Sequence, residues 1–306
     1  MLDVLLQMAV LVAGGIVWRH SRPGGLDIET VRLALTTAVY YFFLPALVFD
    51  VLSHAHLSLD SLRLSLVAAS GVLGGLALAW LLCRSCHMPA AVTGAVVLAA
   101  AFPNATYLGL PVLEAVLGAP GRSIAIQYDL FACLPLLLSV GMLSARHFGH
   151  SDEHYHPLPA LLRVPALVAA MLAIVSAQFG WQLPDFATRA VQLAGAAVIP
   201  IMLVAVGMSL QPAKLLRTNP GPVLLVAFIQ LLLMPLLVHA LSGPVGLQGV
   251  VRTGAVLEAA MPSMLLGIVI CDRYRLDTGV YAAAVTLTTA LSFLTLPFWF
   301  DVLVQS

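Results

Sequence analysis

The sequence predicts an all-α polytopic membrane protein with ten transmembrane helices, arranged as two inverted five-helix repeats. Three observations carry this prediction. The composition is 61% hydrophobic and 9% charged, whereas a soluble domain carries about 25% charged residues. Long apolar runs recur along the whole chain, and each half contains one run that proline interrupts in a matching position. The net charge of zero gives no indication of a nucleic-acid partner, and the lipid bilayer is the expected surroundings.

Ten apolar runs are candidates for crossing a bilayer, which takes about 20 residues as a helix. They lie near residues 2–18, 33–53, 63–83, 90–117, 123–146, 160–179, 187–210, 221–242, 250–271 and 279–304. Asp3 stands at the start of the first run, and Arg19 and Arg22 follow it. A secretory signal has the opposite charge order, so the first run is expected to remain as a span.

The basic residues near the ends of the runs predict the orientation. One set of loops holds ten of the fourteen: Arg19, Arg22, Arg32, Arg84, Arg146, Arg163, Lys214, Arg217, Arg273 and Arg275. The alternate loops hold the other four, Arg63, Arg122, Arg189 and Arg252. The richer set is expected in the cytoplasm, which leaves both termini outside it.

The repeat is visible in two stretches. TGAVVLAAAFPN at 93–104 and TGAVLEAAMPS at 253–263 share TGAV, a pair of alanines and a proline, and Pro45 and Pro200 form another pair at a similar offset. Because five spans are an odd number, the second unit must enter the membrane from the opposite face, which is the inverted repeat of many secondary transporters. The predicted parts are a first repeat at 1–148, a cytoplasmic linker at 149–159 and a second repeat at 160–306.

Two short patterns have a metal or haem alternative. The linker region holds four histidines that could bind a metal, His147, His150, His154 and His156, but a solvated linker is the preferred interpretation. Cys83 and Cys86 belong to CRSCH, which matches the haem-attachment pattern. The charge pattern places that loop in the cytoplasm, so haem is not expected there. We expect no metal site and no cofactor, apart from Na⁺ as one candidate coupling ion.

The prolines predict that the fourth and ninth spans are broken helices. Proline lacks an N–H and clashes with the carbonyl one turn back. As one straight helix, 90–117 would extend roughly 42 Å, against about 30 Å of hydrocarbon. In an inverted repeat the two broken spans can cross near the middle of the membrane. The N-terminal ends of their second halves then favour an anion, and the C-terminal ends of their first halves favour a cation.

The candidate substrate-binding residues surround the two prolines: Pro103, Asn104, Ala105, Thr106, Pro262 and Ser263. Asn104 could donate to a carboxylate, accept from a cation or cap the second half-helix. Glu258 lies four residues before Pro262 and is the candidate for ion coupling, together with Asn104. An acidic group in that position is expected to be protonated or neutralised by a bound cation. The alternative is a structural hydrogen bond to a neighbouring helix.

Three further acids are secondary candidates. Asp50 ends the second span, Glu114 follows the broken region and Asp129 lies early in the fifth span. Each is expected to be a hydrated or paired group near the water boundary rather than a ligand.

At these residues the sequence resembles a known family. FPNATYLGLPVLEAVLG and EAAMPSMLLGIVICDRYRLD resemble the fourth and ninth spans of the auxin efflux carrier family, whose bacterial members include proposed malate and malonate permeases. FFLPALVFDVLS and the VGMSLQP segment resemble the second and seventh spans. The bile acid sodium symporter fold is a more distant resemblance. The family match covers nearly the whole chain.

The resemblance implies a scaffold of helices 1, 2, 6 and 7, through which the protein would form a homodimer, and a mobile core of helices 3–5 and 8–10. It also implies elevator-type alternating access, small organic anions as substrates and a bacterial inner (plasma) membrane location. The family asparagine maps to Asn104. Plant members have a longer linker, a neutral residue at the Glu258 position and a basic residue near Glu114, so auxin itself is not favoured.

The leading hypothesis is a secondary active transporter of a small carboxylate, coupled to H⁺ or Na⁺. The alternative is a sodium-coupled symporter of bile-acid-like or steroid-like anions with a related fold. An enzyme is not expected, because the spans contain no Ser/His or paired-Asp arrangement and no H-E-x-x-H motif. A receptor would need a signalling domain, which the sequence does not contain.

Overall fold

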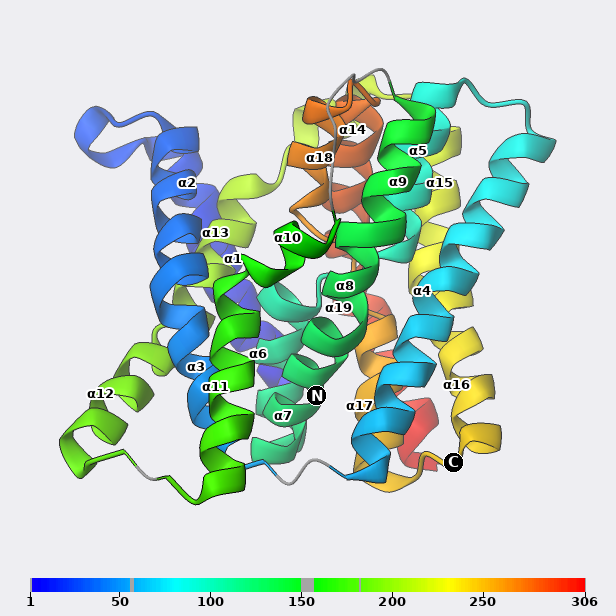
Figure 1. Ribbon diagram of the computed structural model, residues 1–306. Coiled ribbons are helices and arrows are strands. Elements are labelled where there is room, and N and C mark those ends of the chain that lie inside the picture. The colour runs from blue at the N-terminus through cyan, green and yellow to red at the C-terminus, as the bar shows by residue number, and fades with distance from the viewer. Residues whose placement is uncertain (1, 56–57, 150–156, 182, 306) are drawn as a thin grey trace. The chain divides into compact units, whose positions relative to one another are not determined.

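The structure is a computed structural model that describes residues 2–55, 58–149, 157–181 and 183–305. Every regular element in these residues is a helix (Figure 1), as the composition predicts. Within the described ranges, seven helical stretches are long and apolar enough to cross a membrane: Asp3–Ser21, Ile28–Ser53, Leu59–Ser85, Ala119–Phe148, Asp185–Arg217, Pro220–Val245 and Thr278–Val304. The other three predicted spans, 90–117, 160–179 and 250–271, are each interrupted.

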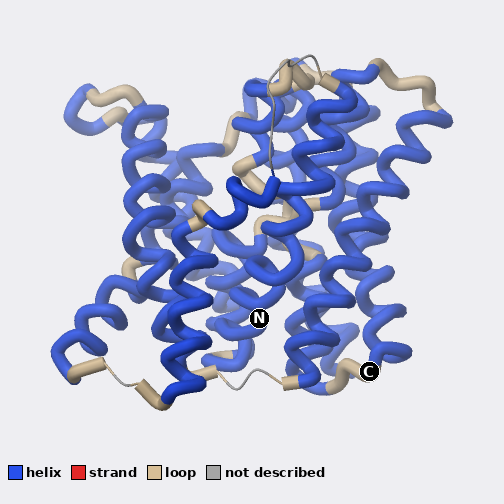
Figure 2. Tube along the Cα trace, viewed as in Figure 1, coloured by secondary structure: helices blue, strands red, loops and turns tan. Residues whose placement is uncertain are grey.

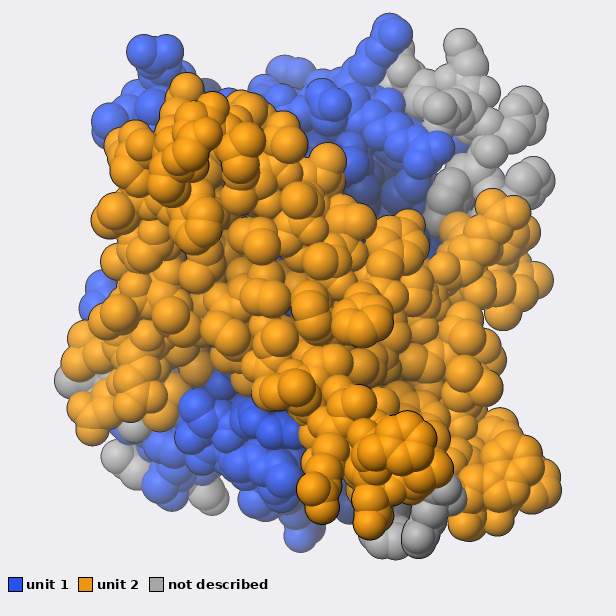
Figure 3. All heavy atoms as spheres, turned by 90° about the vertical axis from the view of Figure 1, so that its left-hand side faces the viewer, with its two compact units in different colours: residues 1–2, 59–155, 210–306 blue, residues 3–58, 156–209 orange. Residues whose placement is uncertain are grey.

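The chain forms two compact units, which Figure 3 colours separately. Unit 2 contains residues 3–58 and 156–209. Its helices are α1 (Leu2–Ser21), α2 (Ile28–Ala38), α3 (Leu44–Ser53), α10 (Pro157–Leu162), α11 (Pro165–Phe179), α12 (Asp185–Ala196) and α13 (Val198–Ser209), with short η1 (Pro23–Gly25) and η2 (Val39–Phe43) between them. Within this unit α3 packs against α11 and α12, and α2 packs against α13.

Unit 1 contains residues 1–2, 59–155 and 210–306. Its first helices are α4 (Leu59–Ser85), α5 (Ala90–Ala101), η3 (Ala105–Gly109), α6 (Leu110–Leu117), α7 (Ala119–Tyr128), η4 (Asp129–Cys133), α8 (Leu134–Leu136), η5 (Leu137–Gly141) and α9 (Met142–Phe148). The second group is α14 (Pro212–Arg217), α15 (Pro220–Phe228), η6 (Ile229–Leu233), α16 (Met234–Val245), α17 (Gly249–Ala259), α18 (Gly267–Arg273) and α19 (Thr278–Gln305).

Five segments of the described chain are wound as π-helix, and four of them share one cause. The segments η2, η3, η4 and η6 each begin six residues before a proline: Pro45, Pro111, Pro135 and Pro235. Proline removes one main-chain donor and pushes away the carbonyl one turn back, so the preceding turn widens. The widened turns place polar residues, including Asp129 and Gln230, at positions that a regular helix would not give them.

The predicted linker and sixth span need correction. The linker residues 150–156 lie outside the described residues, and 157–159, predicted as linker, already belong to α10. The predicted span at 160–179 is divided, because α10 ends at Leu162 and α11 begins at Pro165. A residue that precedes proline disfavours the helical conformation, and Val164 is accordingly extended, with φ −74° and ψ 116°.

Many large apolar side chains lie on the surface. Phe186 and Leu193 on α12 are both 77% exposed, and Leu294 on α19 is 72% exposed. Surface apolar residues of this size are costly in water and favourable in hydrocarbon. Their exposure therefore supports the bilayer as the surroundings of both units.

Helices α1 and α13 of unit 2 approach each other through glycine. A Cβ added at Gly15 would overlap the main-chain oxygen of Val204, and a Cβ added at Gly207 would overlap that of Val12. Small residues permit this close backbone contact between membrane helices. Gly14, next in the chain, would meet nothing. The packing therefore depends on one face of α1.

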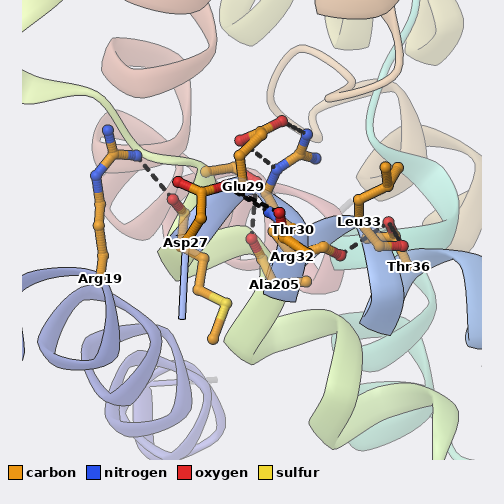
Figure 4. Close-up of polar contacts among 10 residues, drawn as sticks. Arg19, Asp27, Glu29, Thr30, Arg32, Leu33, Thr36 and Ala205 are labelled. Carbon is orange, nitrogen blue, oxygen red and sulfur yellow. Dashed lines mark hydrogen bonds and ion pairs between the residues drawn. The ribbon is translucent and has the colours of Figure 1, made fainter. Parts of the chain in front are cut away.

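The connection from α1 to α2 contains a capped helix start (Figure 4). The main-chain N–H and the hydroxyl of Thr30 donate to the Asp27 carboxylate, at 2.9 and 3.1 Å. Arg32 pairs with Glu29 one turn further along, and Arg19 donates to the main-chain oxygen of Met208 at 2.8 Å. The hydrogen bonds from Thr30 hold the pKa of Asp27 below its ordinary value.

We expect the contribution of this cap to depend on pH. Because the pKa of Asp27 is lower in the folded state than its ordinary value of 3.8, the stabilisation is complete above that ordinary value and is lost as the pH falls through the folded value. Asp27→Ala should therefore melt below wild type at neutral pH, and the difference should shrink as the pH falls below the ordinary value of 3.8. Asp27→Asn keeps an acceptor but does not titrate, so its difference from wild type should also shrink as the pH falls. A difference that stays constant with pH in both variants would contradict the explanation.

Candidate functional site

The candidate site lies in unit 1, where two apolar stretches lose their helical structure. Helix α5 ends at Ala101, and Phe102 takes an extended conformation before Pro103. Helix α17 ends at Ala259, and α18 begins only at Gly267, with Pro262 in the interval. Short loops separate the half-helices (Figure 2). The predicted breaks in the fourth and ninth spans are both confirmed.

The two breaks contact each other directly. Pro103 and Ser263 form an isolated antiparallel bridge. The N–H of Asn104 donates to the oxygen of Pro262 at 2.7 Å, and the N–H of Met264 donates to the oxygen of Phe102 at 3.0 Å. An unpaired backbone group in hydrocarbon costs several kcal/mol. Each broken stretch therefore supplies hydrogen-bond partners that the other lost.

Ser263 has a structural role at this contact. Its hydroxyl donates to the main-chain oxygen of Ala99 at 2.6 Å, and its N–H donates to the hydroxyl of Thr288 on α19 at 3.2 Å. The residue is fully buried. In this structure the hydroxyl of Ser263 satisfies the last turn of α5, and its predicted contact with substrate stays a prediction. Pro103, Ala105 and Pro262 are also buried in these two broken stretches, and their side chains are apolar.

Asn104 offers an unused polar group. Its main-chain oxygen accepts from the N–H groups of Leu108 and Gly109, at 3.2 and 3.0 Å. Its side chain makes no capping hydrogen bond to η3, so the helix-cap alternative is not what the structure has. The residue is nevertheless 96% buried, with 4% exposed. Its side-chain amide is therefore a candidate group for contact with a bound solute.

Glu258 reaches from the last turn of α17 to the other broken stretch. The residue is fully buried, and neither carboxylate oxygen has a hydrogen-bond partner among the described residues. A Cβ added at Gly109 would overlap both of these oxygens. The carboxylate therefore packs against the η3 backbone, in the space that glycine leaves. Burying an ionised carboxylate without partners is too costly to persist, so a proton or a cation must neutralise it.

Asp129 joins the same cluster from η4. The hydroxyl of Thr106 donates to its carboxylate, and Asp129 lies close enough to Glu258 for electrostatic interaction. Asp129 is half-buried, whereas Glu258 has no accessible surface. The residue is thus a paired group, and the widened turn before Pro135 directs it toward Thr106 rather than away. Thr106, Asp129 and Glu258 form one acidic cluster beside the crossing.

Glu114 and Asp50 lie outside that cluster. Glu114 on α6 pairs with Arg122 on α7. Asp50 belongs to unit 2, where it accepts from Gln192 at 3.4 Å and lines a cavity of about 650 Å³. Among the described residues, the side-chain partners of these two acids are Arg122, Gln192 and His54 rather than Asn104, Thr106 or Glu258.

Two polar residues at the site were not predicted. Gln230 on η6 donates to the ends of the broken α17, and Thr288 on α19 accepts from Ser263. A glutamine inside an apolar run, five residues before a proline, is a visible signal for Gln230. Thr288 has no comparable signal, because α19 carries several hydroxyl residues of similar appearance.

Comparison with known proteins gives one consistent result. The model of a family described as membrane transport protein matches residues 3–150 and 158–300. An uncharacterized transporter of Methanothermobacter thermautotrophicus is 29% identical over 98% of both chains. An uncharacterized transporter of Methanocaldococcus jannaschii is 26% identical over 97% of both chains. The uncharacterized transporter YfdV of Escherichia coli is 24% identical over 89% of this chain and 88% of YfdV.

Proposed function

Since the chain belongs to the membrane transport protein family, the auxin efflux carriers that its motifs resemble, we propose that it is a secondary active transporter of a small organic anion. The solute class is a carboxylate such as a dicarboxylate or an auxin-like acid. Transport itself follows from the family. The nature of the solute rests on the site.

The observation that carries the proposal is the paired break with an unused amide beside it. Asn104 is buried, its side chain makes no capping hydrogen bond to η3, and the second half of its span begins at Ala105. The start of a helix has unpaired N–H groups and partial positive charge. An amide donor and a helix start together suit a carboxylate without any lysine or arginine in contact.

The acidic cluster supplies the coupling. Glu258 and Asp129 are close enough to repel each other when both are ionised. Binding of H⁺ or Na⁺ removes this repulsion and favours the form of the core that has its solute bound. Cation binding and anion binding then reinforce each other, which is the requirement for coupled movement.

The arrangement of the transporter is proposed as follows. Ten spans form two inverted repeats, with both termini outside the cytoplasm of a bacterial inner membrane. Unit 2 contains the first, second, sixth and seventh of the ten predicted spans, which supports a scaffold built from them. Unit 1 contains the other six spans, which supports a core built from those. The core shifts across the membrane in an elevator-type cycle, and the scaffold forms a homodimer.

Uptake into proteoliposomes tests this function, with radiolabelled malate, malonate and indole-3-acetate as solutes. Wild type is expected to accumulate at least one of them under an imposed H⁺ or Na⁺ gradient. Glu258→Gln should lose the ion dependence, whereas Glu29→Gln, the same change at an exposed position of α2, should retain it. Unchanged ion dependence in Glu258→Gln would remove the coupling role. Sodium-driven uptake of taurocholate instead would favour the symporter of bile-acid-like anions.

A further inference from the structure

Gln230 is anchored to the broken end of α17 by both hydrogens of its amide. The residue lies in η6, within the apolar stretch Pro220–Val245, and is fully buried. Its Nε2 donates to the main-chain oxygen of Ala259 at 3.2 Å and to that of Met261 at 2.9 Å. Two acceptors on one side require the NH₂ group there. The orientation of the amide therefore follows from the hydrogen bonds, and Oε1 faces the other way, without a partner.

The oxygens that hold this amide are those a cation would otherwise use. The end of a half-helix exposes carbonyls that lack an N–H one turn further on, and such ends coordinate Na⁺ or H⁺ in broken-helix transporters. Around Pro262 these carbonyls accept hydrogen bonds from the protein itself: Glu258 from Met261, Ala259 and Met261 from Gln230, and Pro262 from Asn104. The partial positive charge that complements the helix end is thus already present, as a neutral amide.

We propose, on the basis of the transport function above, that the Gln230 amide occupies the cation position at the broken end of α17, so that this position excludes sodium and Glu258 carries a proton. A hard cation takes several oxygen ligands, and the Ala259 and Met261 oxygens already share the Gln230 NH₂ group, which a cation bound to both oxygens would have to displace. A proton needs only the carboxylate itself. The coupling ion of this chain is therefore H⁺.

The other groups around Glu258 agree with a neutral acid. Tyr128, Asp129 and Cys133, all from the α7–η4 segment, face it within electrostatic range. None of them is a cation. On α16 and α17 the remaining ionisable side chains are His239 and Arg252, which contact each other at 3.3 Å near the start of α17, away from Glu258. Arg122 on α7 pairs with Glu114 instead, and no basic group of the described residues interacts with Glu258.

Thermal melting of the full-length protein in nanodiscs tests the proposal without any solute. Wild type is measured in NaCl, KCl and choline chloride at equal ionic strength. We expect the same melting temperature in all three, because no sodium site is open. A sodium-specific rise in wild type that Glu258→Gln abolishes would overturn the proposal, since a ligand that binds only the folded state raises its stability.

Substitution of Gln230 is expected to create a sodium site that wild type lacks. Gln230→Glu replaces the NH₂ donor with an oxygen that faces two carbonyls, so its melting temperature should rise in NaCl over KCl by roughly 3 °C or more. Gln127→Glu is the matched control, because Gln127 is also buried, with a free Oε1, but donates to Ser123 rather than to a helix end. Should Gln230→Glu fail to fold, Gln230→Ala takes its place, since it also frees the two oxygens.

The outcomes separate this proposal from the transport function. Sodium dependence in the Gln230 variant and not in Gln127→Glu supports the amide as the occupant of the cation position. No sodium dependence in a folded Gln230 variant contradicts it, whatever the protein transports. Failure to transport any of the three solutes leaves the melting result standing and counts against the solute class alone.

Discussion

Replacing Gly109 with alanine is expected to stop transport while the protein still folds. The added Cβ would overlap both carboxylate oxygens of Glu258, and the buried side chain must move to another rotamer. Inserting one methyl group into a packed site costs about 1–3 kcal/mol. Displacement of the coupling group should cost more in function, with uptake reduced at least about tenfold. Proteoliposome uptake and thermal melting measure the two effects.

A double-mutant cycle identifies the cause. Glu258→Ala removes the carboxylate and leaves room for the new methyl group, so the double variant should be more stable than the sum of the single effects predicts. Gly243→Ala on α16 is the control, because a Cβ there would meet nothing within 4 Å. Additive effects of the two substitutions would contradict the proposed contact between Gly109 and Glu258.

Replacing Gly15 with alanine is expected to destabilise unit 2, and the adjacent Gly14→Ala is not. At Gly15 the obstacle is the main-chain oxygen of Val204, and a helix backbone cannot move aside as a side chain can. We expect a loss of roughly 1–3 kcal/mol, and more for valine. Gly14→Ala should be neutral or slightly stabilising, because alanine has the higher helix propensity.

Melting temperature and the yield of folded protein in detergent report on both variants. Because Gly14 and Gly15 are neighbours on α1, insertion into the membrane and helix propensity change equally in the two. Equal melting temperatures would show that the close approach of α1 to α13 does not limit stability.

The helices and the two breaks were predictable because their causes are local. The apolar runs set the spans, and the missing N–H of Pro103 or Pro262 disrupts a helix wherever proline stands. The stretch 90–117 would also be longer, as one straight helix, than the hydrocarbon layer is thick, which predicted a break independently. The matching offset of the two stretches then predicted that they meet, and the contact between Asn104 and Pro262 confirms it.

The details of the site were not predictable because they depend on helix rotation. The widened turn before Pro135 brings Asp129 to Thr106, and the one before Pro235 brings Gln230 to Ala259 and Met261. Sequence periodicity assumes 3.6 residues per turn, and a π-turn shifts every later side chain. The hydrogen bond from Ser263 to Ala99 was not predictable either, since the two residues lie 164 positions apart in the chain.

The mutual pairing of the two broken stretches has a consequence for biosynthesis. The acceptors of Ala99 and Phe102 are synthesised well before Ser263 and Met264, which supply their donors. At about 5–20 residues per second a ribosome needs roughly 8–30 s to make the intervening chain. During that interval the first stretch resides in or near the membrane with main-chain groups exposed, so water, lipid headgroups or an insertion chaperone must satisfy them until the later stretch arrives.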